Sequence, residues 1–186
     1  MYRLINAIAI IGEVACFGDN KYEAFLKSLI SVPPYFKLPN KNKTILLSGA
    51  ITDSFIPSAK ALLKGGYKLL ATSHVSPLLN QYEIEHIMLT HKETDSEIIQ
   101  HILQRKIDLV INFPTHNEDP LNYQIRRRAV DFGVPCLTNE QICSFLATAL
   151  TTVKEMPIKS YSDYFREQTT TANIEVIVSE EQMTSK

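Results

Sequence analysis

The sequence has few of the features that mark metal-bound, disulfide-bonded, membrane-spanning or nucleic-acid-binding proteins. Its 186 residues contain three cysteines, an odd number without metal-ligand spacing, which argues against a disulfide framework and fits a reducing compartment. No run reaches the ~18 apolar residues that span a bilayer, and the apolar residues 5–11 lack the basic flank of a signal peptide. Nineteen basic and twenty acidic side chains give a net charge of −1. We therefore expect no metal, no nucleic-acid partner and no membrane partner.

Short apolar runs alternate with segments of helical periodicity between residues 44 and 150. The expected strands are residues 44–48, 67–71, 86–89, 107–111 and 134–137. The expected helices are residues 53–63, a short helix that ends at residue 82, and residues 97–106, 122–132 and 140–150. Their expected N-caps are Asp53 or Ser54, Asp95, and Thr138 or Asn139, and Asn122 could be the cap of the helix at 122–132. Such alternation predicts an α/β fold with three layers and a five-stranded parallel sheet, of Rossmann or flavodoxin-like architecture.

The two ends of the chain follow a different pattern. Residues 1–32 hold an apolar strand and a helix with helical spacing over residues 21–30, and a polar linker with two adjacent prolines occupies residues 33–43. The strand has no partner strand nearby, which suggests a remnant of a larger fold. Residues 151–186 lose the alternation, and we expect residues 159–165 to pack back as an aromatic strap before a mobile tail.

The candidate site lies where the expected strands end, because ligands of open α/β sheets bind outside the carboxyl ends of the strands. Asn112 and Asn122 flank the loop after the strand at residues 107–111, and an asparagine can donate and accept hydrogen bonds at once. Thr72, Ser73 and Ser76 offer hydroxyls in front of a helix, an arrangement that suits a phosphate or a carboxylate. These residues could equally be helix caps. The loop has no glycine, so it is neither a Walker nor a dinucleotide motif.

Other charged residues carry weaker signals. Three consecutive arginines, Arg126, Arg127 and Arg128, point in different directions on a helix; they could hold an anion, or they could be solvated or paired. The five histidines are dispersed, and no serine or cysteine sits on a nucleophile elbow. We therefore predict no catalytic residue.

Several strings of the sequence resemble one enzyme family. The string 12–18 with residues 23–27 resembles the closing stretch of the second ATP-grasp unit in carbamoyl-phosphate synthetase large subunits, and residues 44–150 resemble the methylglyoxal-synthase-like domain that ends them. The strings 108–112, 122–127 and 133–139 are most similar to the ammonia-dependent, mitochondrial type. The resemblance covers about residues 11–166. It implies an ATP-grasp remnant at 1–32, a linker at 33–43, an effector-binding domain at 44–150, and a strap and tail at 151–186.

The resemblance implies a regulatory role. In the ammonia-dependent type this domain binds the activator N-acetyl-L-glutamate, and in glutamine-dependent relatives it binds nucleotides or similar effectors. Thr72, Asn112 and Asn122 match the family's activator-contacting residues, whereas Val75, His91 and Thr115 stand where the family has a hydroxyl, a tryptophan and an asparagine. The implied partners are a small anionic effector and the ATP-grasp regions of a parent enzyme that uses ATP and Mg. No cofactor is expected in this chain, and the implied location is the mitochondrion.

Two alternatives remain open. Methylglyoxal synthase, a lyase that acts on dihydroxyacetone phosphate, carries its catalytic carboxylate at the position of Asp95. In this sequence, however, Glu93 and Thr94 replace that family's glycines, and Leu121 replaces a second acidic residue. The other alternative is a remnant that binds no effector.

Overall fold

The structure is a computed structural model that describes residues 15–31, 42–90, 96–114, 119–157, 159–160 and 162–163. Five parallel strands form one sheet in the order β3-β2-β1-β4-β5. The strands are β1 (Thr44–Gly49), β2 (Lys68–Thr72), β3 (Ile87–Leu89), β4 (Leu109–Phe113) and β5 (Cys136–Leu137). The expected five-stranded parallel sheet is therefore confirmed.

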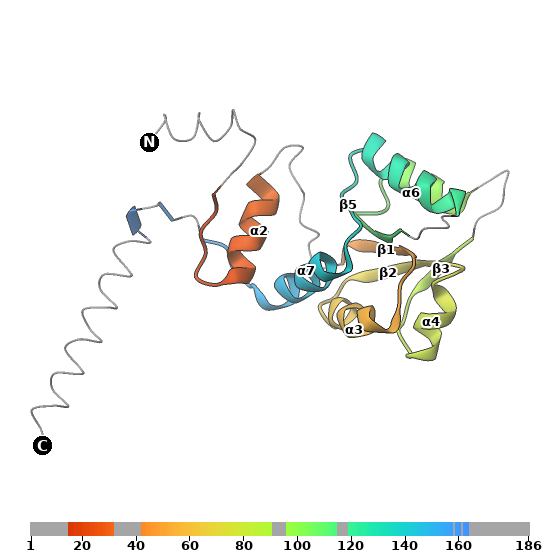
Figure 1. Ribbon diagram of the computed structural model, residues 1–186, viewed down its shortest axis with the longest axis horizontal. Coiled ribbons are helices and arrows are strands. Elements are labelled where there is room, and N and C mark those ends of the chain that lie inside the picture. The colour runs from red at the N-terminus through yellow and green to blue at the C-terminus, as the bar shows by residue number, and fades with distance from the viewer. Residues whose placement is uncertain are drawn as a thin grey trace, which may run out of the picture.

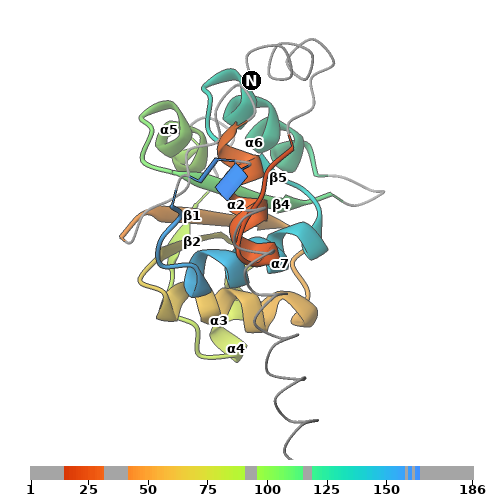
Figure 2. The same cartoon turned by 90° about the vertical axis from the view of Figure 1, so that its left-hand side faces the viewer.

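Helices cover both faces of this sheet and make three layers (Figure 2). The helices are α2 (Lys21–Ser31), the 3-10 turn η1 (Asp53–Phe55), α3 (Ile56–Lys64), α4 (Ser76–Gln81), α5 (Glu97–Leu103), α6 (Pro120–Asp131) and α7 (Glu140–Thr152). One layer holds α3, α4 and α7, and the other holds α5 and α6. Each βαβ unit places its helix on one face, as a parallel sheet requires.

The alternation of side chains along each strand divides the core into two clusters. Ile45, Leu47 and Ile111 point to the α3/α7 face, where Phe55 and Leu146 are also fully or almost fully buried. The opposite α5/α6 face buries a second set: Leu46, Leu70, Leu89, Ile98, Ile102, Ile107, Val110, Ile125, Ala129 and Val134. Burial of large aliphatic side chains on both sides explains why the strands read as continuous apolar runs.

Strand ends and helix starts depart from the sequence expectations by one to three residues. β4 covers 109–113 instead of 107–111, because Asn112 and Phe113 pair with Ser48 and Gly49 of β1 although the apolar run ends before Asn112. α5 is capped by Ser96, which accepts from the Ile99 amide, and Asp95 lies outside the described residues. Asn139 caps α7 as expected.

Two further helix starts are corrected. α3 follows a 3-10 turn over Asp53–Phe55, so neither Asp53 nor Ser54 caps it. Helix α6 begins at Pro120, and Asp119 is its N-cap through a bond from the Leu121 amide. Proline is favoured at the first helical position because it has no amide hydrogen to satisfy there. Asn122 is therefore inside the first turn of α6, and its side chain is not the cap.

The chain before the sheet is joined to the domain through α7. Tyr22 and Phe25 of α2 contact Phe145 of α7 with ring centroids 4.8 and 5.0 Å apart, and Figure 1 shows α2 beside α7, away from the sheet. Near the other end of the chain, the Lys159 ammonium lies 3.0 Å from the Asp19 carboxylate. The described part of the expected strap thus contacts the segment before α2. Its aromatic residues, Tyr161, Tyr164 and Phe165, lie outside the described residues, as does the strand expected at 5–11.

Within the described ranges, no helix is long and apolar enough to cross a membrane, and no group of three or more acidic, histidine or cysteine side chains is placed to hold a metal ion. Cys16, Cys136 and Cys143 are free.

Candidate functional site

A polar row crosses the carboxyl end of the sheet on its α5/α6 face. The register pairs Ser48 of β1 with Asn112 of β4, and it places Thr72 of β2 beside Ser48, one step beyond the Leu47–Ala71 pair. These three side chains share a face, because partners across a parallel ladder point the same way. All three are buried, with exposed fractions of 0% for Ser48 and Asn112 and 4% for Thr72.

The row lies at the point where the winding of the sheet reverses. From β1 the chain adds β2 and β3 on one side, then returns to place β4 and β5 on the other side of β1. The crevice between β1 and β4 is the topological switch point, the usual ligand position in open α/β sheets. Ser48 and Asn112 are the paired residues at this crevice.

Asn112 is the centre of a hydrogen-bonded network. Its Nδ2 donates to Ser48 Oγ at 2.8 Å and to Asn122 Oδ1 at 3.3 Å. Its Oδ1 accepts from Arg126 Nη1 at 2.8 Å. Ser48 Oγ donates in turn to the Ile111 carbonyl at 3.3 Å. Burying these polar groups is tolerated because they satisfy one another.

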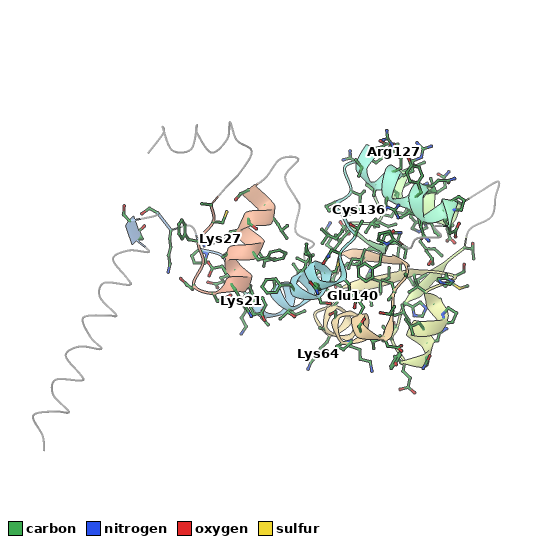
Figure 3. The ribbon with its side chains drawn as sticks, viewed as in Figure 1. Lys21, Lys27, Lys64, Arg127, Cys136 and Glu140 are labelled. Atoms are coloured by element: carbon green, nitrogen blue, oxygen red, sulfur yellow. The ribbon has the colours of Figure 1, made fainter. Side chains whose placement is uncertain are left out.

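Arg126 points to a different side of α6 from Arg127 and Arg128, its two neighbours in the arginine triplet. Asn122 and Arg126 are four residues apart, so both face the sheet from one side of α6. Arg127 lies on the outer side of the helix, where it bonds to Asp131 (Figure 3), and Arg128 is exposed. Arg126 is therefore paired with a candidate site residue, Asn112, whereas Arg127 is paired with Asp131 on its own helix.

The arginine also affects a neighbouring thiol. Burial raises the pKa of Cys136 to about 11, and the nearby Arg126 charge opposes this rise by favouring the thiolate. Cys136 packs against the α5/α6 cluster. A positive charge is thus held between β4, β5 and α6.

Gly49 lets β1 and β4 approach closely at this edge. It has a φ of +75°, and an added Cβ would lie 2.3 Å from the Phe113 carbonyl oxygen. The Ala50 amide donates to that same oxygen at 2.8 Å. Only glycine has both the conformational freedom and the small size for this position.

The predicted site residues at the end of β2 and in the loop after it differ in burial and in hydrogen-bond partners. Thr72 is buried at the strand end, Ser73 is exposed, and Ser76 Oγ bonds to His86 Nε2 at 2.7 Å. His86 Nδ1 lies 2.8 Å from the Ile84 carbonyl, so the ring donates there and accepts from Ser76. Val75 is 2% exposed and belongs to the α3/α7 cluster.

The remaining expected positions lie at the edge of the described chain. His91 and Thr115 fall outside the described residues, as do 93–95. The Glu97 carboxylate accepts from the amide and the hydroxyl of Thr90 at 3.1 and 3.2 Å, so Thr90 and Glu97, on either side of residues 91–95, lie close together. The bond from the Thr90 amide lowers the pKa of the Glu97 carboxyl. Leu121 packs against the α5/α6 cluster, as an apolar residue does.

Comparison with known proteins identifies the family to which this fold belongs. Residues 54–138 match the MGS-like domain family, and the chain belongs to that family. Its homologues include the mitochondrial carbamoyl-phosphate synthase (ammonia) of Aquarana catesbeiana, 37% identical over 164 residues, and that of Homo sapiens, 36% identical over 165 residues. The multifunctional protein pyr-3 of Neurospora crassa is 39% identical over 167 residues.

These matches cover most of this chain but little of the relatives. They span 84% of the chain for the frog and human synthases and 81% for pyr-3. The same regions make up 11% of each synthase and 9% of pyr-3. The chain thus corresponds to about a tenth of the length of these curated relatives.

Proposed function

We propose that this chain is an effector-binding regulatory domain of a carbamoyl-phosphate synthase, and that it binds N-acetyl-L-glutamate or a related small anion. The observation that carries the proposal is the hydrogen-bonded network at the switch point of the sheet, in which the buried Ser48 and Asn112 meet the half-buried Asn122 and Arg126. Two of these residues, Asn112 and Asn122, also match the activator-contacting positions implied by the resemblance.

The chemistry of this network favours an anion. Arg126 supplies a permanent positive charge, and its guanidinium donates only. Asn122 lies in the first turn of α6, whose amides and dipole favour negative charge. N-acetyl-L-glutamate has two carboxylates and an amide. Its carboxylates need hydrogen-bond donors, and its amide needs one donor for the carbonyl oxygen and one acceptor for the N–H. Thr72 adds a hydroxyl that can donate or accept.

In a parent enzyme, such binding would control carbamoyl phosphate synthesis from ammonia, bicarbonate and ATP. The effector must bind the active state more tightly than the inactive state, with a coupling of typically ~1–3 kcal/mol. ATP and Mg would be bound by the ATP-grasp regions of that parent, which are the partner we propose for α2 and the preceding segment. The mitochondrion is the proposed location, because the frog and human relatives are mitochondrial proteins.

Calorimetric titration of the chain with N-acetyl-L-glutamate, UMP, IMP and UTP tests the proposal. We expect heat from N-acetyl-L-glutamate in the wild-type chain and an affinity at least about tenfold lower in Asn112→Ala, because the change removes the centre of the network. Asn80→Ala is the matched control, since Asn80 is exposed on α4. Binding of a nucleotide alone would replace the proposed effector by the nucleotide class. The nucleotides are included because the resemblance implies nucleotide effectors in glutamine-dependent relatives.

A further inference from the structure

Ser76 and His86 form a second hydrogen-bonded pair, which the proposed function does not use. The Nδ1 atom of His86 lies 2.8 Å from the Ile84 carbonyl, which can only accept, so Nδ1 carries the hydrogen of the neutral ring. The other nitrogen, Nε2, therefore accepts from the Ser76 hydroxyl at 2.7 Å. A hydroxyl that donates to an imidazole, whose second nitrogen is held by a third group, is the arrangement of an activated nucleophile.

The backbone between the two residues holds this pair in place. Ser76 is the first residue of α4, and His86 directly precedes β3. The chain folds back between them, because the Ile84 amide donates to the Leu79 carbonyl at 3.0 Å and Glu83 has a φ of +54°, which is uncommon for a residue with a side chain. Ile84 is 3% exposed, so the carbonyl that orients the imidazole is anchored in the core. The pair is thus set by the fold and not by two mobile side chains.

The surroundings of the pair limit what can reach it. Ser76 is 5% exposed and His86 is half-buried, whereas His74 and Pro77 beside Ser76 are exposed. The hydroxyl is therefore shielded from bulk water although it lies close to the surface. Room for a reacting group is small, which favours a short acyl chain. Neither residue belongs to a nucleophile elbow, so sequence motifs do not reveal the pair.

We infer that Ser76 is a nucleophile for small activated acyl esters, with His86 as its general base and the Ile84 carbonyl as the group that orients the base. Ser76 Oγ forms a bond to the acyl carbon, and the bond from that carbon to the leaving oxygen breaks. His86 Nε2 takes the hydroxyl proton and passes it to the leaving oxygen. Water then attacks the acyl-serine in the same way, which releases the acid and restores Ser76. This activity is separate from effector binding, so its failure would leave the proposed function unchanged.

Labelling of the wild-type full chain with a small alkyl fluorophosphonate tests the nucleophile. Attack by Ser76 Oγ on phosphorus displaces fluoride and leaves a stable adduct. We expect mass spectrometry of the intact chain to show one label, and peptide mapping to place it on Ser76. The absence of a label on Ser76 would overturn the inference, whether or not any variant folds.

Hydrolysis of p-nitrophenyl acetate tests the base. His86→Ala should slow the acylation of Ser76 by about a hundredfold or more, because a positioned general base contributes about 10²–10⁴-fold. Ser28→Ala and His101→Ala are the matched controls, since Ser28 donates to the Phe25 carbonyl and His101 Nδ1 lies 2.8 Å from the Glu97 carbonyl. Both should react at the wild-type rate, and circular dichroism checks that every variant is folded. An unchanged rate in folded His86→Ala would reduce the pair to a structural hydrogen bond and overturn the inference.

The length of the acyl chain tests the size limit. We expect p-nitrophenyl octanoate to acylate Ser76 at least about tenfold more slowly than the acetate ester, because the longer chain does not fit beside a hydroxyl of such low exposure. Equal rates for the two esters would overturn the assignment to small acyl groups.

Discussion

The two faces of the sheet end in opposite ways. On the α3/α7 face the last side chains that the three central strands contribute are apolar: Leu47, Ala71 and Phe113. On the α5/α6 face the rows Leu46, Leu70 and Val110 are followed by Ser48, Thr72 and Asn112. These polar residues are as deeply buried as the apolar ones. One strand therefore carries a core residue and a site residue side by side.

The difference shows how a parallel sheet separates stability from binding. Burial of apolar side chains stabilises the fold in proportion to area, whatever their neighbours. A buried amide or hydroxyl stabilises only when its partners are in place, so its contribution depends on geometry. Changes on the first face should thus alter the free energy of unfolding, and changes on the second should alter ligand binding.

Adjacent residues of β4 give the largest test of this comparison. Ile111→Ala should lower the free energy of unfolding by about 2–5 kcal/mol, because it leaves a cavity among buried side chains. The affinity of the folded protein for effector should stay the same. Asn112→Ala should lower stability less, by about 1–3 kcal/mol, and should lower the affinity for effector at least about tenfold. Urea unfolding and calorimetry on both variants measure the two effects, and equal losses of affinity would remove the distinction between the faces.

The next test concerns the close approach of β1 and β4. Gly49→Ala should lower the free energy of unfolding by about 2–3 kcal/mol, since the new Cβ would meet the Phe113 carbonyl at a positive φ. Gly133→Ala is the matched control. Gly133 has a φ of +67° but no atom within 4 Å of an added Cβ, so only the backbone penalty of about 1 kcal/mol applies. Similar losses in both variants would show that the strand contact is not tight. Urea denaturation resolves these values.

The smallest effect compares two cysteines, one on each side of the sheet. Burial raises the pKa of Cys136 to about 11 and that of Cys143, in the α3/α7 cluster, to about 12. At pH 8 the thiolate fractions are then roughly one in a thousand and one in ten thousand, so Cys143 should be alkylated about tenfold more slowly in the folded protein. A Cys16→Ser background removes the third thiol, and faster reaction of Cys143 would contradict the expectation.

The same pKa shifts give a pH dependence with a definite sign. Both pKa values are higher in the folded chain than the usual value near 9, so the folded state retains protons that the unfolded state loses. Their contribution to stability is complete below about pH 8 and falls as pH rises from about 9 to 12. Urea unfolding between pH 8 and pH 11 should show this decline, and it should be shallower in Cys143→Ala.

Local sequence patterns were sufficient to predict the fold, because each buried face of a strand or helix requires apolar residues at a regular spacing. Runs such as 44–48 and 107–111 mark strands that are covered on both faces, and the intervening helices follow from 3.6-residue spacing. Strand ends were less accurate, since Asn112 is polar and therefore interrupts the apolar run while it still pairs in the sheet. The helix start at Pro120 could have been predicted from the Asp119–Pro120 pair, which is a recognised N-terminal signal.

The candidate site could be predicted only in part, because some of its residues come together through the order of the strands in the sheet. Asn112 and Asn122 are visible as polar residues around one loop, and their spacing from Arg126 was also available in the sequence. The role of Ser48 depends on β1 lying next to β4, a partner 64 residues away. Local sequence patterns do not predict which strands are neighbours in the sheet. Arg126 could have been separated from its neighbours by the four-residue interval that places it on the face of Asn122.

Helix α7 contacts both the sheet domain and α2. It begins after Asn139, at the carboxyl edge of the sheet where the polar row lies, and Phe145 in its middle meets α2. Thirteen helical residues span roughly 20 Å, and a tilt of about 6° around the centre moves each end by roughly 1 Å. Because Phe145 lies near the middle of α7, a tilt about that centre moves the two ends of the helix and leaves the contact with α2 almost in place, so α2 is attached to α7 at the point that such a tilt moves least.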